Sequence, residues 1–256
     1  MSVHYDVDHE GRVAVVAIDR PQVRNAMDAS TARAVETAVD RVEADPEVWV
    51  GILTGGADVF CAGADVRELA AGRAHHIHTR RGGFGGFVRL ERTKPFIAAV
   101  EGPALAGGME MVLACDLVVA SASATFGLPE VRRSNVCGGG ALFRLPERVS
   151  QPLAMEWLLT GDTVTAEQAH AAGLLNQLCP AGTALEHARA LAARINRNAP
   201  LAVRATREGV LGAGDRADAE RWQLSNRLVR EVAASSDFDE GVRAFVEKRV
   251  PRWSAS

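Results

Sequence analysis

Lysine is almost missing from this sequence. Of its 29 basic residues only Lys94 and Lys248 are lysines, so catalysis through a lysine Schiff base has at most two candidates. The cysteines lie far apart and form no C-x-x-C pair, which argues against zinc or redox sites and predicts reduced thiols in the cytoplasm. No uncharged apolar run reaches about 18 residues, and the polar N-terminus has no basic patch followed by an apolar stretch, so we expect neither a membrane span nor a secretion signal.

The charge balance and the missing motifs exclude several further classes. The formal net charge of −3 gives no electrostatic reason to bind nucleic acid or an anionic membrane. No G-x-G-x-x-G, Walker A, G-x-S-x-G or H-E-x-x-H motif occurs, which argues against dinucleotide-binding folds, P-loop NTPases, serine hydrolases and zinc proteases. His75, His76 and His78 lie among arginines without a nearby carboxylate, so a solvated loop is favoured over a metal site, and no metal is predicted.

Strand and helix patterns alternate along most of the chain. Apolar runs predict strands at residues 13–19, 48–54, 96–100 and 116–120, and helices are predicted at 28–44, 64–71 and 107–114. This alternation is typical of an α/β fold. After about residue 147 the pattern becomes helical and includes a capping box at Thr165-Ala-Glu-Gln168. We therefore expect an α/β core over residues 1–196 and a helical C-terminal region over 197–256.

The least regular segment runs from residue 70 to residue 92. It contains Gly82-Gly-Phe-Gly-Gly86, and glycines make an ordered helix costly. We therefore predict a mobile segment of helix and loop.

Two turns rich in small residues are the first part of a candidate site. Phe60-Cys-Ala-Gly-Ala-Asp65 and Gly102-Pro-Ala-Leu-Ala-Gly-Gly-Met-Glu110 each lead from a predicted strand into a predicted helix. Small residues let a ligand approach the backbone, and the first amides of a helix have no internal acceptor. Two facing turns of this kind could therefore hold a developing oxyanion, although glycines often serve only to make tight turns.

Two glutamates favour a catalytic interpretation of these turns. Glu110 lies one turn into the second helix, and Glu130 follows in the loop Phe126-Gly-Leu-Pro-Glu130. Either residue alone could be a solvated surface side chain. Paired carboxylates beside an oxyanion hole, however, suit proton transfer next to a carbonyl, with one acting as base and the other as acid.

These segments together resemble the enoyl-CoA hydratase/isomerase (crotonase) superfamily over nearly the whole chain. The resemblance is carried by Ile18-Asp-Arg-Pro with Asn25-Ala-Met27, by the two small-residue turns, by Thr160-Gly-Asp and by Glu240-Gly-Val-Arg-Ala-Phe-Val-Glu-Lys-Arg249. It implies a crotonase-like α/β spiral of ββα units, followed by a C-terminal helical trimerisation region. A homotrimer or a dimer of trimers is therefore expected.

The resemblance also implies roles for individual residues. The backbone amides of Ala64 and Gly107 match the oxyanion hole that polarises an acyl-CoA thioester. Glu110 matches the glutamate that activates water for attack at C3, and Glu130 matches the one that delivers a proton to C2. The positions implied for binding the substrate and its coenzyme A are Cys61, Ala62, Ala64, Asp65, Val66, Arg67, Gly107, Gly138, Phe245 and Lys248. Coenzyme A is part of the substrate, so no separate cofactor is expected.

The sequence departs from the family pattern at a few positions. Ala106-Gly107-Gly108 stands where three glycines are frequent, Cys137 where a proline is common, and Arg132-Arg133 where apolar residues are frequent. These differences leave the acyl chain undetermined. A 2-enoyl-CoA hydratase is the leading interpretation, an isomerase or a carnitinyl-CoA-type dehydratase is the alternative, and a non-catalytic acyl-CoA binder or RNA binder is disfavoured by the two glutamates and the negative charge.

Overall fold

The core is built on a six-stranded sheet in the order β1-β2-β3-β6-β8-β11. The computed structural model describes residues 2–212 and 218–256. β1 pairs antiparallel with β2, and every other neighbouring pair is parallel. The strands are β1 (Val3–Asp8), β2 (Val13–Ile18), β3 (Val50–Thr54), β6 (Phe96–Val100), β8 (Leu117–Ser121) and β11 (Gln177–Cys179). Strands β3 and β6 are buried along their whole length, which explains why their sequences are apolar except for Thr54 at the end of β3.

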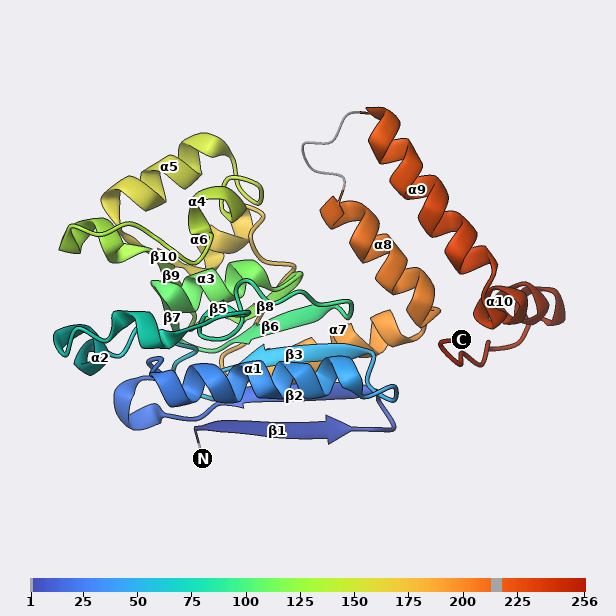
Figure 1. The fold of residues 1–256 in the computed structure, drawn as a ribbon, viewed down its shortest axis with the longest axis horizontal. Helices are drawn as coiled ribbons and strands as arrows, with labels where there is room; N and C mark the ends of the chain where they lie inside the picture. The colour runs from blue at the N-terminus through green and yellow to red at the C-terminus, as the bar shows by residue number, and fades with distance from the viewer. Residues whose placement is uncertain (1, 213–217) are drawn as a thin grey trace.

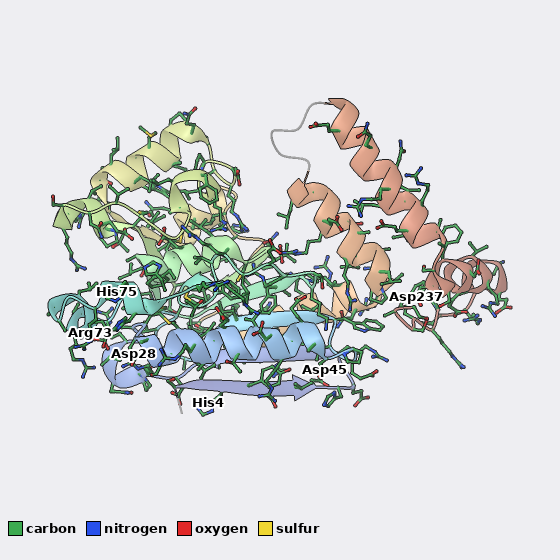
Figure 2. All side chains as sticks on the ribbon, viewed as in Figure 1. His4, Asp28, Asp45, Arg73, His75 and Asp237 are labelled. Atoms are coloured by element: carbon green, nitrogen blue, oxygen red, sulfur yellow. The ribbon has the colours of Figure 1, made fainter. Side chains whose placement is uncertain are left out.

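Helices cover both faces of this sheet. The main core lies between one face and the helices α1 (Ala29–Ala44) and α3 (Gly107–Ala114). α7 (Ala184–Asn196) covers the other face with buried alanines. Asp28 and Asp45 mark the two ends of α1 (Figure 2). At the second end, Lys94 is buried and its Nζ donates to the carbonyls of Val42 and Asp45 at 2.6 Å each, which gives this rare lysine a structural function.

A second, three-stranded sheet joins the two predicted catalytic segments. Its order is β10-β9-β7, with β7 (Pro103–Leu105) parallel to β9 (Thr125–Gly127) and β10 (Thr163–Thr165) antiparallel to β9. The remaining short elements of the core are η1 (Pro21–Val23), α2 (Val66–Ala70), η2 (Ala74–Ile77), β4 (His78–Thr79), β5 (Gly83–Phe84), η3 (Pro129–Arg133), α4 (Ala141–Arg144), α5 (Gln151–Thr160) and α6 (Ala166–Ala171).

The last three helices project away from the sheets (Figure 1). They are α8 (Pro200–Gly212), α9 (Asp218–Ala233) and α10 (Ser236–Glu247). The end of the chain folds back onto α10, where the buried carboxylate of Asp237 accepts the amides of Ser254 and Ala255 at 2.7 and 3.0 Å. Among the described residues, no helix combines the length and the apolar character that crossing a membrane requires.

Most predicted elements are present, and the differences concern short strands. The four predicted strands correspond to β2, β3, β6 and β8, the helices at 28–44 and 107–114 are present, and Thr165 and Gln168 form the expected capping box. Two strands, β10 and β11, follow residue 147, where only helices were expected.

The segment of residues 70–92 differs from the mobile loop that was predicted. Phe84, Phe87 and Val88 are buried in the main core, and a Cβ at Gly86 would lie 2.0 Å from the carbonyl oxygen of Ala32. Its glycines therefore allow close packing against α1.

Candidate active site

The first small-residue turn is held in place by Asn25. Asn25 is buried, with a left-handed φ of 56°, a conformation in which asparagine is enriched. Its Oδ1 accepts from the amide of Arg20 at 2.7 Å, and its Nδ2 donates to the carbonyls of Gly55 and Val59 at 2.5 and 2.6 Å. One side chain thus connects the loop after β2 to the segment that precedes the turn.

The far side of the same turn is fixed by Asp65. Its buried carboxylate caps α2 by accepting the amide of Arg67 at 3.0 Å, and it pairs with Arg20 at 3.2 Å. Burial alone would raise the pKa of Asp65, but the bonds from Arg67 and Arg20 outweigh burial and lower that pKa. Arg20 also pairs with Asp28 at 2.9 Å, so the turn and the start of α1 share one guanidinium.

Two backbone amides meet where the turns face each other. The amide of Ala64 and the amide of Gly107, at the start of α3, donate to no acceptor within the described residues. A Cβ built on Gly63 would lie 3.4 Å from the Gly107 nitrogen, which places the two turns in contact. The partial positive charge of these two amides is therefore available to a ligand oxygen.

The second turn is tightly constrained on both sides of Gly107. Ala106 has φ 51° and ψ −126°, the first central position of a type II′ turn, which strongly favours glycine. A Cβ on Gly107 would lie 2.2 Å from the ring of Phe84, so no larger residue fits under that ring. Phe84 belongs to the segment that was predicted to be mobile, and it covers the turn instead.

Glu110 is held by a third turn, at Gly138-Gly139-Gly140. Its buried Oε1 accepts the amide of Gly139 at 2.6 Å and the amide of Ala141 at 3.2 Å. Burial has the largest effect on the pKa of Glu110 and raises it, and the nearby Glu130 charge raises it further. The two backbone amides and the Arg144 charge lower this pKa, but the net shift is upward. A base with a raised pKa lies closer to neutrality, where general bases work best.

Glu130 reaches the same site from the neighbouring strand. β7 leads into Ala106 and α3, whereas β9 leads through Leu128 into η3, which carries Glu130. Because these two strands are parallel, they deliver the two glutamates at the same edge of the sheet. The Oε2 atom of Glu130 is buried, and none of the residues that the structure describes bonds to it. Burial, followed by the Glu130 charge, raises the pKa of the neighbouring Cys137 thiol.

The residues implied for coenzyme A binding fall into distinct environments. Cys61 is fully buried, and its amide and carbonyl already bond to Pro103 and Leu105 at 3.2 and 2.9 Å. The amide of Ala62 bonds to Arg24 at 3.0 Å. Val66 and Arg67 are exposed on α2, and Gly138 has open space where a Cβ would stand. Only the exposed members of this set offer side chains to a ligand.

The two C-terminal candidates lie elsewhere. α10 and α2 are at opposite ends of the longest axis of the molecule (Figure 1). Lys248 follows α10 and is exposed, whereas the side chain of Phe245 lies outside the described residues. Within one copy of the chain, Arg67 on α2 and Lys248 after α10 are therefore not neighbours.

Sequence reasoning missed the residues that hold Glu110. The donors are Gly139 and Ala141, and Arg144 in turn donates to the Gly139 carbonyl at 2.9 Å. The glycine tract was the available signal, but it does not reveal which amide points at a carboxylate. Among the described residues, no group of three or more histidine, cysteine or acidic side chains is arranged to hold a metal ion.

Known proteins match this chain over nearly its whole length. The enoyl-CoA hydratase/isomerase family model matches residues 8–256. The chain is 38% identical to a mevalonyl-coenzyme A hydratase of Aspergillus fumigatus, covering 95% of this chain and 92% of that protein. It is 36% identical to a carnitinyl-CoA dehydratase of Proteus mirabilis, covering 99% of each. The crystal structure of an enoyl-CoA hydratase from Mycobacterium tuberculosis superposes with a TM-score of 0.95 at 42% identity, covering 100% of this chain and 99% of that one.

Proposed function

We propose, from the premise that this chain belongs to the enoyl-CoA hydratase/isomerase family and has its crotonase fold, that it hydrates the 2,3 double bond of a 2-enoyl-CoA. The observation that carries the proposal is the convergence of two glutamates on one sheet edge beside two unbonded amides. Glu110 and Glu130 lie on elements that follow the parallel strands β7 and β9, and the amides of Ala64 and Gly107 belong to the two small-residue turns. This arrangement suits the addition of water next to a thioester carbonyl.

The division of roles follows from the environment of each group. The thioester oxygen accepts the amides of Ala64 and Gly107, which stabilise the enolate charge as it develops; losing one such donor typically costs about 3 kcal/mol of transition-state stabilisation. Glu110, aligned by the Gly139 amide, takes a proton from water as the water oxygen bonds to C3. Glu130 gives a proton to C2.

Coenzyme A is proposed to lie across α2, as part of the substrate. Arg67 is exposed there, next to the free amide of Ala64, and its guanidinium suits a phosphate. Gly138 offers open space for the acyl part. Arg67→Gln is expected to raise KM for the thioester without changing kcat, whereas Arg67→Lys keeps the charge and most of the affinity.

A homotrimer or homohexamer completes the proposal. The helices that project from the core expose large apolar side chains, and such faces mark interaction surfaces; these include Val210, Leu211, Val229, Phe238 and Val242. Lys248 of one copy would then contact the coenzyme A of another. The four buried, unpaired cysteines support a reducing, cytoplasmic setting. Light scattering should give three or six times the chain mass, and a monomer would contradict this assembly.

Dehydration of a polar acyl-CoA is the second candidate. The relative of that type is 36% identical over nearly the full length, and the exposed Arg132 and Arg133 follow Glu130 on η3, where they could face a polar acyl group. The same pair of glutamates can remove water in the reverse direction.

A panel of acyl-CoA thioesters tests both functions. Hydration of crotonyl-CoA and longer 2-enoyl-CoAs is followed by the loss of ultraviolet absorbance of the conjugated double bond, and carnitinyl-CoA dehydration by its appearance. Glu110→Gln and Glu130→Gln should each abolish turnover. The proposal would be overturned if both variants kept their hydration and dehydration activities. It would also be overturned if the enzyme only converted 3-enoyl-CoA substrates to their conjugated isomers.

A further inference from the structure

Arg144 is the side chain that holds Gly139, the residue whose amide bonds to Glu110. It lies on α4, immediately after the glycine tract, and its guanidinium is forked between two carbonyl groups. Nη1 donates to Gly139 at 2.9 Å and Nη2 donates to Val88 at 2.7 Å. The amide of Gly139 makes the shorter of the two bonds to Glu110, at 2.6 Å. A single residue, Gly139, thus receives Arg144 on its carbonyl and presents its amide to the carboxylate.

The second arm of the fork ties this turn to the other catalytic turn. Val88 is buried and its amide bonds to the carbonyl of Phe84 at 3.4 Å, and the Phe84 ring packs directly over Gly107. The guanidinium therefore spans the turn that aligns Glu110 and the segment that covers an oxyanion amide. Only a planar, two-armed donor can make both bonds at once.

We propose that Arg144 is a positioning residue for the hydration reaction: by bonding to the Gly139 carbonyl it fixes the backbone of this residue, so that the Gly139 amide aligns the carboxylate of Glu110. This inference rests on the proposed function, in which Glu110 is the base. Arg144 does not touch the reacting atoms, so its loss acts on kcat through the orientation and ionisation of Glu110 rather than on KM.

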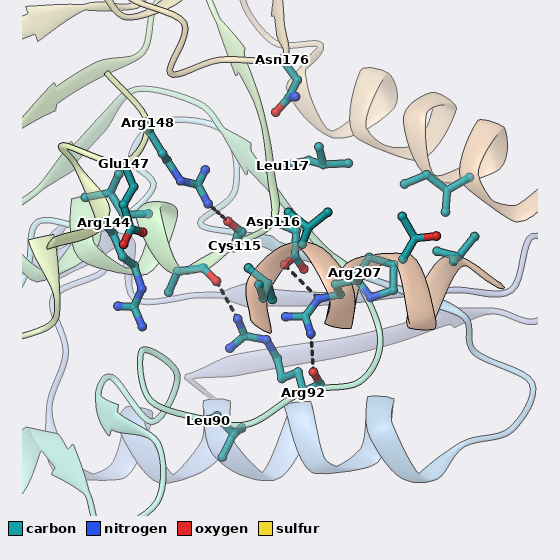
Figure 3. Close-up of a pocket in the computed structure, with 18 of the residues that line it drawn as sticks. Leu90, Arg92, Cys115, Asp116, Leu117, Arg144, Glu147, Arg148, Asn176 and Arg207 are labelled. Carbon is teal, nitrogen blue, oxygen red and sulfur yellow. Dashed lines mark hydrogen bonds and ion pairs between the residues drawn. The ribbon is translucent and has the colours of Figure 1, made fainter. Parts of the chain in front are cut away.

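The chain offers a matched control four residues further on. Arg148 lines the same pocket of about 1370 Å³ as Arg144 and is likewise half-buried. Its guanidinium donates to the carbonyl of Cys115 (Figure 3) and not to the glycine tract. Burial lowers the pKa of both guanidinium groups. Arg148→Met therefore removes an arginine of similar environment without touching the support of Glu110.

The first measurement does not depend on turnover. The carboxyl carbons of the glutamates are labelled with ¹³C and titrated by NMR, with the Glu110 signal assigned by its absence in Glu110→Gln. The groups facing Glu110 are the Glu130 carboxylate, the Cys137 thiol, the Arg144 guanidinium and the amides of Gly139 and Ala141. Arg144→Met removes a positive charge and loosens an amide that both lower the Glu110 pKa, so its titration should move to higher pH, whereas Arg148→Met should leave it in place.

The second measurement is the pH profile of kcat with the best thioester of the panel. Arg144→Met should lower kcat at neutral pH by about tenfold, with KM within about twofold, because a small misplacement of a catalytic group is costly. The acidic limb of its profile should move upward in parallel with the NMR titration. Arg148→Met should keep both parameters within about twofold of the parent enzyme.

Arg144→Lys separates charge from geometry and guards against unfolding of the methionine variant. Lysine keeps the positive charge but reaches only one carbonyl, so a positioning role predicts a several-fold loss of kcat that lysine does not restore. The inference is overturned if a folded Arg144 variant, with lysine or methionine, has the same Glu110 titration midpoint and the same kcat as Arg148→Met. If instead the parent enzyme turns over no enoyl thioester, the proposed function fails, and the NMR comparison still decides whether Arg144 aligns Glu110.

Discussion

Gly139→Ala is the substitution that most directly tests how Glu110 is held. A Cβ at this position would lie 2.5 Å from Oε2 of Glu110 and 2.8 Å from its carboxyl carbon. Ordinary contact begins near 3.4 Å, so the carboxylate has to retreat by about 0.9 Å. A misplacement of about 1 Å at a reacting group lowers rates roughly 100-fold, which corresponds to about 2.7 kcal/mol in the activation barrier.

The same substitution should affect folding much less than catalysis. The nearest colliding atoms belong to the end of a side chain rather than to backbone, so Glu110 can move aside at a cost of about 1 kcal/mol in the free energy of unfolding. We therefore expect kcat for a 2-enoyl-CoA to fall about 100-fold, with a small change in the urea midpoint. Ultraviolet assays and urea titrations of one preparation give both quantities.

The neighbouring glycine provides the control. A methyl group in place of the hydrogen at Gly138 would have no atom within 4 Å. Gly138→Ala should therefore keep kcat within about twofold of the parent. If the new methyl group contacts the substrate, the effect should appear in KM. A Gly139→Ala enzyme with the kcat of the parent would show that the position of the Glu110 carboxylate does not limit the reaction. Glu110 would then lose its assignment as the base.

Three further predictions follow from individual contacts. Ala106→Gly should relieve backbone strain of about 1–3 kcal/mol at φ 51°, reduced by the conformational entropy that glycine loses on folding. Tm should therefore rise by about 2–4 °C for each kcal/mol gained in the free energy of unfolding. A lower Tm measured by calorimetry would contradict this expectation. Asn25→Ala removes three hydrogen bonds at a buried site and should lower the free energy of unfolding by about 3 kcal/mol, as measured in urea. Glu110 must be ionised to act as a base, and its pKa is raised above the ordinary value of 4.5. The kcat should therefore fall as the pH drops through a midpoint above 4.5. A kcat that stays constant down to pH 4.5 would exclude Glu110 as the base.

The large elements of this fold could be predicted from the sequence because burial leaves a pattern. β3 and β6 are buried along their whole length, and apolar except for Thr54, because helices cover both faces of the sheet. Strands β7, β9 and β10 have only three residues each, too few for periodicity to be read. They exist as strands because they pair with one another, and that pairing depends on contacts between residues far apart in the chain.

The candidate site divides in a similar way. Glu110 and Glu130 could be predicted because the chemistry needs acidic side chains and the resemblance supplies their positions. The amides of Gly139 and Ala141 and the fork of Arg144 could not, because a backbone amide carries no signal in the identity of its residue. An arginine that bonds to carbonyls is likewise indistinguishable in sequence from one on the surface. For the same reason, glycines that predicted mobility at residues 82–86 instead permit Phe84 and the residues around it to pack against the site.

Ala106 shows how closely the two halves of the site are connected. Its amide donates to the carbonyl of Gly127 at 2.8 Å, at the end of the strand that leads to Glu130, and its carbonyl accepts the amide of Glu110 at 3.1 Å. The residue after it supplies the oxyanion amide. A non-glycine residue keeps this strained conformation only where the surrounding structure determines it more strongly than its own preference. The strain at Ala106 therefore lies at the junction of the proposed base, the proposed acid and the proposed oxyanion donor, where a relaxed turn would move all three relative to one another.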